Sequence, residues 1–148
     1  MAPDVIQLGN DERDEFLGTG GTGVLSFAAD ANDPPHSVPV SYGYDAADET
    51  FYFRLATGAD SGKGDPTDRP VSFVTYGQRQ GRWNSVVAEG RLVVTTDEDV
   101  ALETLQGLER VHIPFVEIFG APPDAIDFEF FRLDPADLTA RTEQPVRR

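Results

Sequence analysis

The chain has 148 residues and a mass of 16.2 kDa, which suffices for one domain with its own hydrophobic core. Its 26 acidic residues outnumber its 12 lysines and arginines, giving a formal net charge of −14 and a pI near 4.3. This balance argues against nucleic acid as a partner, because binding phosphates requires clustered cations. The sequence has no cysteine, which excludes disulfides, thiolate catalysis and cysteine-bound metals.

The charged residues also indicate where the protein works. Lys63 is the only lysine, and such an acidic, arginine-using surface is typical of a salt-rich cytoplasm. An ordinary acidic protein from a high-GC genome is the alternative. The first residues lack a basic start followed by an apolar run, and no stretch reaches the roughly eighteen apolar residues of a membrane helix. We therefore expect a cytoplasmic protein with no membrane association.

In the first half of the chain, one short helix precedes three strands. The helix is predicted over 12–17, with Asn10 or Asp11 as its N-cap and Gly18 as its stop. The glycine-rich stretch 18–23 lacks a phosphate-loop pattern and is expected to be a flexible connector. Alternating apolar residues and turn signals then predict strands at 23–29, 36–45 and 50–56, forming an antiparallel meander.

The second half predicts more strands and one longer helix. Strands at 70–77 and 82–95 flank the turn QRQG, and the second is long enough to bend around a barrel. Leucines at helical spacing predict a helix over 96–110, and 125–134 reads as a half-buried strand. The polar end from Leu138 is expected to fray, with 141–148 flexible. The pattern predicts a single domain, 1–148, that is mainly β: a small antiparallel barrel with a few short helices.

The common catalytic constellations are missing from the sequence. His36 and His112 are its only histidines, and neither an HExxH pair nor a G-x-S-x-G elbow occurs. We expect no metal site, and no catalytic residue is assigned.

The strand at 36–45 has two unlike faces. Alternation places four bulky residues on one face and four small ones on the other: Val38, Val40, Tyr42 and Tyr44 against Ser37, Pro39, Ser41 and Gly43. A bare strand face permits a flat ring to lie against the backbone. A solvent-facing polar side is the alternative interpretation.

Cations and hydroxyls cluster just after the next strand. Arg54 lies in an apolar and aromatic run, where a guanidinium needs a phosphate or carboxylate partner, such as an internal salt bridge, or must reach solvent. Thr57, Ser61 and Lys63 follow in a glycine-rich segment and together make a reasonable phosphate cradle. Trp83 shares a strand face with Ser85, and either flanks a ligand ring or packs in the barrel.

Taken in order, these segments resemble the pyridoxamine 5′-phosphate oxidase-like family of FMN-binding split barrels, in a haloarchaeal form. The resemblance covers nearly the whole chain, through FLGTGGTGVLSF, HSVPVSYGYD, TFYFRLATG, the S-x-K element, RPVSFVTYG, WNSVVAEGRL and FEFFRLDPADLTAR. It departs from the family where GDPTDR follows Lys63 and where Ala140 replaces a closing glycine. No pattern specific to pyridoxamine phosphate is present, so vitamin B6 oxidase activity is not expected.

The resemblance implies a Greek-key split barrel that forms a homodimer with FMN at the subunit interface, and an FMN-dependent oxidoreductase acting on a small organic substrate. It also implies the residues around the cofactor. Ser37, Val38, Pro39, Val40 and Ser41 would run along the isoalloxazine ring, Phe53 and Arg54 would lie near the phosphate, Ser61 and Lys63 would hold it beside Thr57, and Trp83, Asn84 and Ser85 would approach the flavin. The alternatives are a non-catalytic flavin-binding or storage protein, or a relative that binds deazaflavin or haem.

Overall fold

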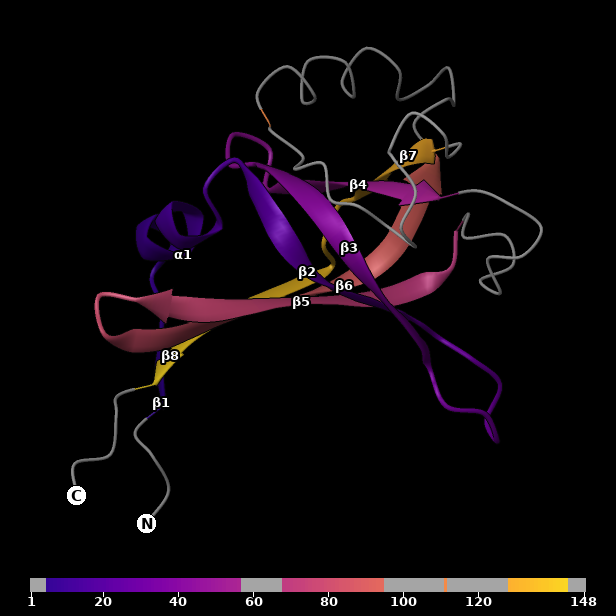
Figure 1. Cartoon of the computed structure of the whole chain (residues 1–148), viewed down its shortest axis with the longest axis horizontal. Coiled ribbons are helices and arrows are strands. Elements are labelled where there is room, and N and C mark those ends of the chain that lie inside the picture. Colours follow the sequence, from indigo (N-terminus) through magenta and orange to yellow (C-terminus); the bar gives the residue numbers. More distant parts are fainter. Residues whose placement is uncertain (1–4, 57–67, 95–110, 112–127, 144–148) are drawn as a thin grey trace, which may run out of the picture.

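The computed structural model describes residues 5–56, 68–94, 111 and 128–143 (Figure 1). The predicted helix at 96–110 lies outside these residues, as do Thr57, Ser61 and Lys63.

The described chain is mainly β, as the sequence predicts. Its elements are β1 (Val5–Gln7), α1 (Asn10–Leu17), β2 (Gly20–Phe27), β3 (His36–Asp45), β4 (Thr50–Ala56), β5 (Pro70–Arg79), β6 (Arg82–Val94), β7 (Phe128–Leu133) and β8 (Asp137–Glu143). The predicted strands at 36–45 and 50–56 have the observed bounds of β3 and β4. The β5–β6 hairpin turns through Gln80 and Gly81, both at positive φ, as a tight two-residue turn requires.

Six strands close into an antiparallel barrel. Their order is β6-β5-β2-β3-β4-β7, and β7 pairs back onto the far end of the long strand β6. β8 and β1 extend the sheet from the other end of β6. Figure 1 shows β6 curving to meet β7, while the β2–β3 hairpin projects beyond the barrel. The predicted antiparallel split barrel is confirmed.

The barrel interior is filled by aromatic rings from the inward positions of its strands. Phe73 packs edge-on against Phe53, with ring centroids 4.9 Å apart, and against Tyr42 at 5.1 Å. Phe51 joins them at 5.4 Å from Phe73. Because such tilted pairs add to the stabilisation from burial, these rings fix how the strands pack.

Helix α1 is held at one end of the barrel by a buried cation. Arg13 is only 6% exposed and forms ion pairs with Asp14 and Glu49, each at 2.9 Å. The Tyr44 hydroxyl donates to Asp14 at 2.7 Å, and burial, together with this hydrogen bond, raises the pKa of Tyr44. Leu17 completes the attachment by entering the core. In the part of the chain that the structure describes, no helix has the length and hydropathy of a membrane span.

The glycine-rich stretch is a strand, so the expected flexible connector is wrong. β2 begins at Gly20, and residues Gly20–Gly23 pair with Gly43–Val40 of β3. A Cβ atom at Gly23 would lie 2.6 Å from both Phe73 Cε1 and the Val74 carbonyl oxygen. Glycine is therefore required there by close packing against an aromatic ring rather than by a turn.

The expected frayed end is also wrong for the residues up to Glu143. β8 pairs with β6 from Asp137↔Glu89 to Glu143↔Trp83, and its last three residues also pair with β1. Leu138 packs against the core, and its other inward side chains are small: Ala140 and Thr142 are 3% and 4% exposed. The polar residues point outward, which is why this strand resembles a tail in the sequence.

Candidate functional site

The two faces of β3 differ as predicted. Val40, Tyr42 and Tyr44 belong to the core, and Val38 packs against it. Ser37 and Pro39 lie on the outer face, where the Ser37 and Ser26 hydroxyls are 2.7 Å apart. From Ser37 to Gly43, the outer side of this strand therefore carries only small side chains.

Ser41 is the unusual member of this outer face. It is 3% exposed, and its Oγ has no hydrogen-bond partner among the described residues. A buried hydroxyl without a partner costs about 1–3 kcal/mol, so such atoms often mark a place that a ligand or water completes. Ser41 is thus a buried polar group without a hydrogen-bond partner among the described residues, in the middle of a strand face of small residues.

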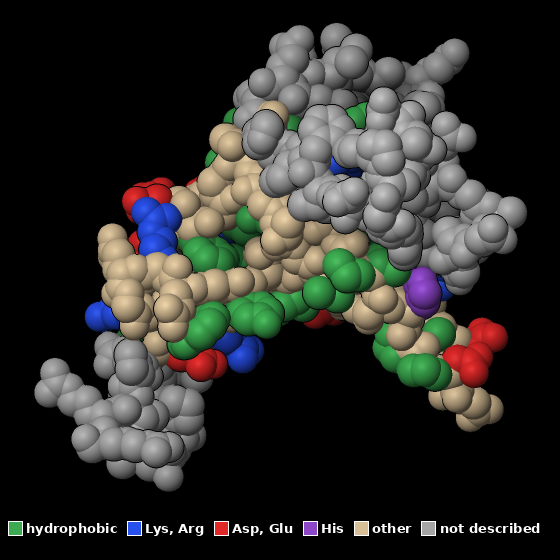
Figure 2. Space-filling model, viewed as in Figure 1, with side chains coloured by type: hydrophobic (Ala, Val, Ile, Leu, Met, Phe, Trp, Pro, Cys, Tyr) green, Lys and Arg blue, Asp and Glu red, His purple; other side chains and the backbone are tan. Residues whose placement is uncertain are grey.

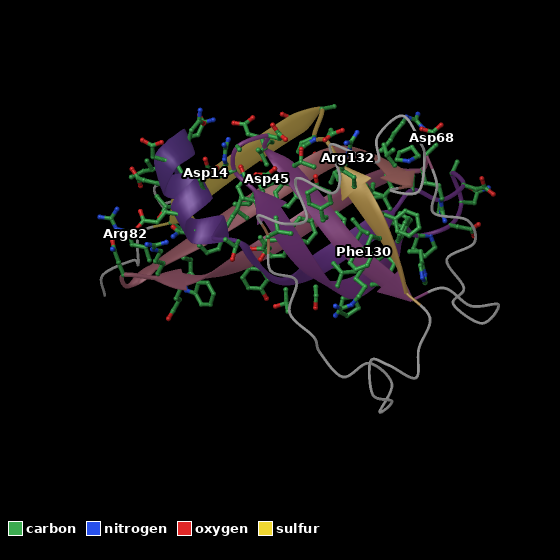
Figure 3. All side chains as sticks on the ribbon, turned by 90° about the horizontal axis from the view of Figure 1, so that it is seen from above. Asp14, Asp45, Asp68, Arg82, Phe130 and Arg132 are labelled. Atoms are coloured by element: carbon green, nitrogen blue, oxygen red, sulfur yellow. The ribbon has the colours of Figure 1, made fainter. Side chains whose placement is uncertain are left out.

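Arg54 lies beside Ser41 on the neighbouring strand. Gly43 pairs with Tyr52, so alternation places both Ser41 and Arg54 on the outer face. Arg54 is 7% exposed, and burial lowers the pKa of its guanidinium. Across β4 and β7 it pairs with Phe130, which is 38% exposed (Figure 3). An anion bound here would stabilise the charged guanidinium.

Trp83 is exposed on the same sheet face rather than packed in the barrel. It is 46% exposed, and its ring centroid lies 6.0 Å from that of Tyr76, which is 69% exposed. The interpretation of Trp83 as barrel packing is therefore wrong. Val24 is a third exposed apolar residue of this face, at 39%. Tyr76 and Val24 are absent from the predicted site, although alternation in their strands could have placed both outward.

The predicted site residues fall into two groups. The side chains of Ser37, Pro39, Ser41, Arg54, Trp83 and Ser85 share the outer face, whereas those of Val38, Val40, Phe53 and Asn84 point inward. Phe53 is fully buried among the core rings, so only its backbone can reach an outer ligand.

Distance further divides the outer group. β3 and β6 are separated by β2 and β5. Three strand spacings amount to about 14 Å. Trp83 and Ser85 therefore lie too far across the sheet to join Ser41 and Arg54 in one pocket of the same chain.

An open cleft of about 760 Å³ occupies the end of this face near the β2–β3 hairpin. Ser26, Pro35, Ser72, Glu89 and Asp137 are among its lining residues. The described residues contain no cluster of three or more side chains that could hold a metal ion.

Several solved structures share this fold, and some of them are structures of cofactor-binding proteins. A Mycobacterium smegmatis protein titled FAD binding protein matches with a TM-score of 0.70 and 17% identity, covering 95% of this chain and 100% of that one. A Mesorhizobium loti FAD-binding protein matches with a TM-score of 0.64 and 21% identity, covering 97% of this chain and 100% of that one. A FAD and heme binding protein from M. smegmatis matches with a TM-score of 0.62 and 13% identity, covering 96% of this chain and 76% of that one. At these identities the likeness shows the fold.

The sequence itself identifies the family. No curated protein matches the chain. The sequence profile described as pyridoxamine 5′-phosphate oxidase, however, matches residues 9–142, which include every described strand from β2 to β7 and most of β8. The chain therefore belongs to the pyridoxamine 5′-phosphate oxidase family.

Proposed function

We propose that this protein binds FMN against the outer face of β3 and β4 and acts as an oxidoreductase, passing a hydride or electrons through the flavin to a small organic substrate. One observation carries the proposal. The buried Ser41 hydroxyl, which has no hydrogen-bond partner among the described residues, lies beside the buried Arg54 guanidinium, on a strand side that carries only small residues from Ser37 to Gly43.

These residues fit a phosphorylated ring system. Because Ser37, Pro39 and Ser41 are small, a flat ring can approach the β3 backbone closely. The Ser41 hydroxyl would then gain a partner, and Arg54 would neutralise part of the phosphate charge. Lys63, Ser61 and Thr57 remain the predicted residues for the rest of the phosphate grip. Bound FMN supplies the redox chemistry, while the chain binds and orients it.

We infer that a second copy of the chain completes the site. Trp83 and Ser85 cannot reach Ser41 and Arg54 within one chain, but a partner's copies of these residues can. In a two-fold dimer each subunit would then give the β3–β4 half of one site and the Trp83 half of the other. The exposed Val24, Tyr76 and Trp83 supply apolar surface for such an interface.

Haem binding is the second candidate function. A structural neighbour is titled a FAD and heme binding protein, and the described part of this chain holds a suitable ligand atom. His36 Nε2 is buried and has no hydrogen-bond partner among the described residues. Further candidates are the binding of FAD or deazaflavin in place of FMN, and flavin binding without catalysis.

A visible spectrum of the purified protein, followed by chromatography of the cofactor released on denaturation, tests the proposal. We expect the blue absorption band of oxidised flavin, release of FMN, and bleaching of the band by a reduced nicotinamide or reduced deazaflavin. A Soret band would favour haem, and release of FAD would show that the cofactor is FAD in place of FMN. A colourless protein that takes up none of these on titration would refute cofactor binding, whereas a flavin that no donor reduces would refute catalysis.

A further inference from the structure

The open cleft beside the β2–β3 hairpin has the size of a small-molecule site. Its volume of about 760 Å³ falls within the range of about 300–1,000 Å³ that is typical of ligand pockets. Figure 2 shows hydrophobic side chains in a band over β5, beside the hollow bounded by this hairpin. Apolar residues from four segments line the cleft, among them Ala28, Pro35, Pro70, Val93 and Ala136. The cleft can therefore hold the carbon skeleton of an organic molecule.

The turn between β7 and β8 forms one wall of the cleft. The Ala136 amide donates to the Glu89 carbonyl oxygen at 2.8 Å, which fixes this turn against β6. Gly90 permits the close approach, because a Cβ atom there would lie 3.2 Å from the Asp134 carbonyl oxygen. The chain then continues as β8, so that Asp137 pairs directly with Glu89. Local packing thus brings two carboxylates together in the lining of the cleft.

These two carboxylates have no counter-charge among the described residues. Glu89 and Asp137 are exposed, and neither side chain forms an ion pair or hydrogen bond within the described part of the chain. Like charges directly opposite each other destabilise a sheet, because their Cβ atoms are only about 4.5–5.5 Å apart. The third carboxylate of the lining, Asp134, is already engaged by Arg132 at 3.1 Å and by Thr50 at 2.9 Å. Glu89 and Asp137 are therefore the carboxylates that can accept hydrogen bonds from a ligand.

Arg91 does not supply the missing charge. It is the only cation among the described lining residues, and it follows Glu89 by two positions on the same face of β6. Its Nη1 atom donates to the Asp68 carbonyl oxygen at 2.8 Å, and no ion pair joins it to either carboxylate of the pair within the described residues. With three carboxylates and one guanidinium, the lining keeps an excess of negative charge.

We propose that this cleft binds a small organic amine. The ammonium group of the ligand lies between the Glu89 and Asp137 carboxylates, whose spacing across the two strands lets both accept hydrogen bonds from one cation. The carbon skeleton covers the apolar lining around Pro35 and Pro70 and removes that surface from water. Binding also relieves the repulsion between the two carboxylates, so the ligand stabilises the pairing of β6 with β8.

Other kinds of ligand fit the lining less well. An inorganic cation would leave the apolar residues uncovered, and the described residues contain no group of three or more side chains that could hold a metal ion. A neutral molecule would leave the repulsion between Glu89 and Asp137 in place, and an anion would add to it. Only a cation attached to an apolar body matches both parts of the cleft.

The amine site is separate from the proposed flavin site. Glu89 lies on β6, and Ser41 lies on β3, with β2 and β5 between these strands. Three strand spacings amount to about 14 Å, too far for one small molecule to contact both residues. Binding of the amine therefore does not depend on binding of FMN.

A titration of the isotope-labelled protein with benzylamine, followed by the NMR signals of its backbone amides at moderate salt, tests the site. Benzyl alcohol, a neutral molecule of nearly the same shape, is the matched control ligand. We expect benzylamine to shift the amide signals of Ala28, Gly90 and Ala136, and to bind about tenfold more tightly than benzyl alcohol, because only the amine pairs with the carboxylates. Higher salt should weaken the binding of benzylamine, since both carboxylates are exposed.

Isosteric substitutions identify the carboxylates that recognise the amine. Glu89→Gln and Asp137→Asn each remove one negative charge, and we expect each to weaken benzylamine binding about threefold and the double variant about tenfold. Without ligand, the double variant should have a higher Tm than the native chain, because the repulsion between the strands is gone. Glu143→Gln is the matched control: Glu143 is exposed on the same face of β8 but lies opposite Trp83, at the other end of the strand. We expect this control to bind benzylamine normally.

The outcomes separate the amine site from the alternatives and from the proposed cofactor. Equal affinities for benzylamine and benzyl alcohol, or an unchanged benzylamine affinity in the double variant, would overturn the site. Calcium that shifts the same amides and displaces benzylamine would show a metal site instead. A changed sedimentation coefficient in the double variant would show that the carboxylates face another copy of the chain, which also overturns the site. The double variant should bind FMN like the native chain, and a native chain that binds benzylamine but no FMN counts against the cofactor alone.

Discussion

Removing the Ser41 hydroxyl should have opposite effects on the apoprotein and on its complex with FMN. The atom is buried without a partner among the described residues, so Ser41→Ala removes a group that costs the fold about 1–3 kcal/mol. Removing the hydroxyl recovers part of this cost, so we expect the free energy of unfolding of the apoprotein to rise by about 1 kcal/mol, or its Tm by about 2–4 °C for a chain of this size. The same change deletes a hydrogen bond to the flavin worth about 0.5–1.5 kcal/mol, which weakens binding about 2- to 13-fold.

Two measurements on the same variant check this prediction. Urea unfolding of the apoprotein, followed by the fluorescence of the single tryptophan, gives the stability, and quenching of FMN fluorescence gives the dissociation constant. Thr75→Val is the matched control, because the Thr75 hydroxyl is also buried but donates to the Thr22 carbonyl at 2.8 Å. We expect the control to lose about 1 kcal/mol and to bind FMN normally. If Ser41→Ala destabilises the apoprotein and leaves the FMN affinity unchanged, the hydroxyl is structural and the site assignment fails.

Two further predictions concern the barrel itself. Gly23→Ala forces a methyl group to within 2.6 Å of Phe73 and the Val74 carbonyl, so we expect a loss of about 1–3 kcal/mol in urea unfolding; native stability would show that the ring can move aside. Burial raises the pKa of Tyr42 to about 12, from a value near 10 in the unfolded chain. The neutral phenol therefore contributes fully to the free energy of unfolding below pH 10, and this contribution is lost as the pH rises toward 12. Tyr42→Phe should therefore reduce the fall in stability over that interval by up to about 3 kcal/mol, and an unchanged slope between pH 10 and 12 would contradict the assigned pKa.

The sequence predicted the parts of the fold whose side chains alternate strongly. β3 and β4 carry large aromatic residues inward, and their bounds follow directly from that period. β8 escaped prediction because its inward residues include Ala140 and Thr142, which are small, while charged residues point outward. The alternation of Leu138, Ala140 and Thr142 was the available signal. The glycines of β2 escaped because their role is set by Phe73, a residue distant in sequence.

The types of residue at the candidate site could be predicted from the sequence, but their positions relative to one another could not. The small outer face of β3 followed from alternation, since each strand reports its own two faces. The distance between Trp83 and Arg54 could not be predicted in this way, because strand order depends on pairings between segments distant in the chain. Without that order, Asn84 appeared equivalent to its neighbours, although its side chain faces inward and is 8% exposed.

The pairing of β8 between β6 and β1 has a consequence for how the protein is made. β1 pairs only with β8 among the described strands, and Val5 is joined to Glu143. During synthesis, the outer edge of β6 from Trp83 to Glu89 must wait for β8, with its backbone amides and carbonyls available to other chains. A chain stalled before β8 would therefore present a ready template for aggregation, so the synthesis of β8 is the step that covers this edge of β6.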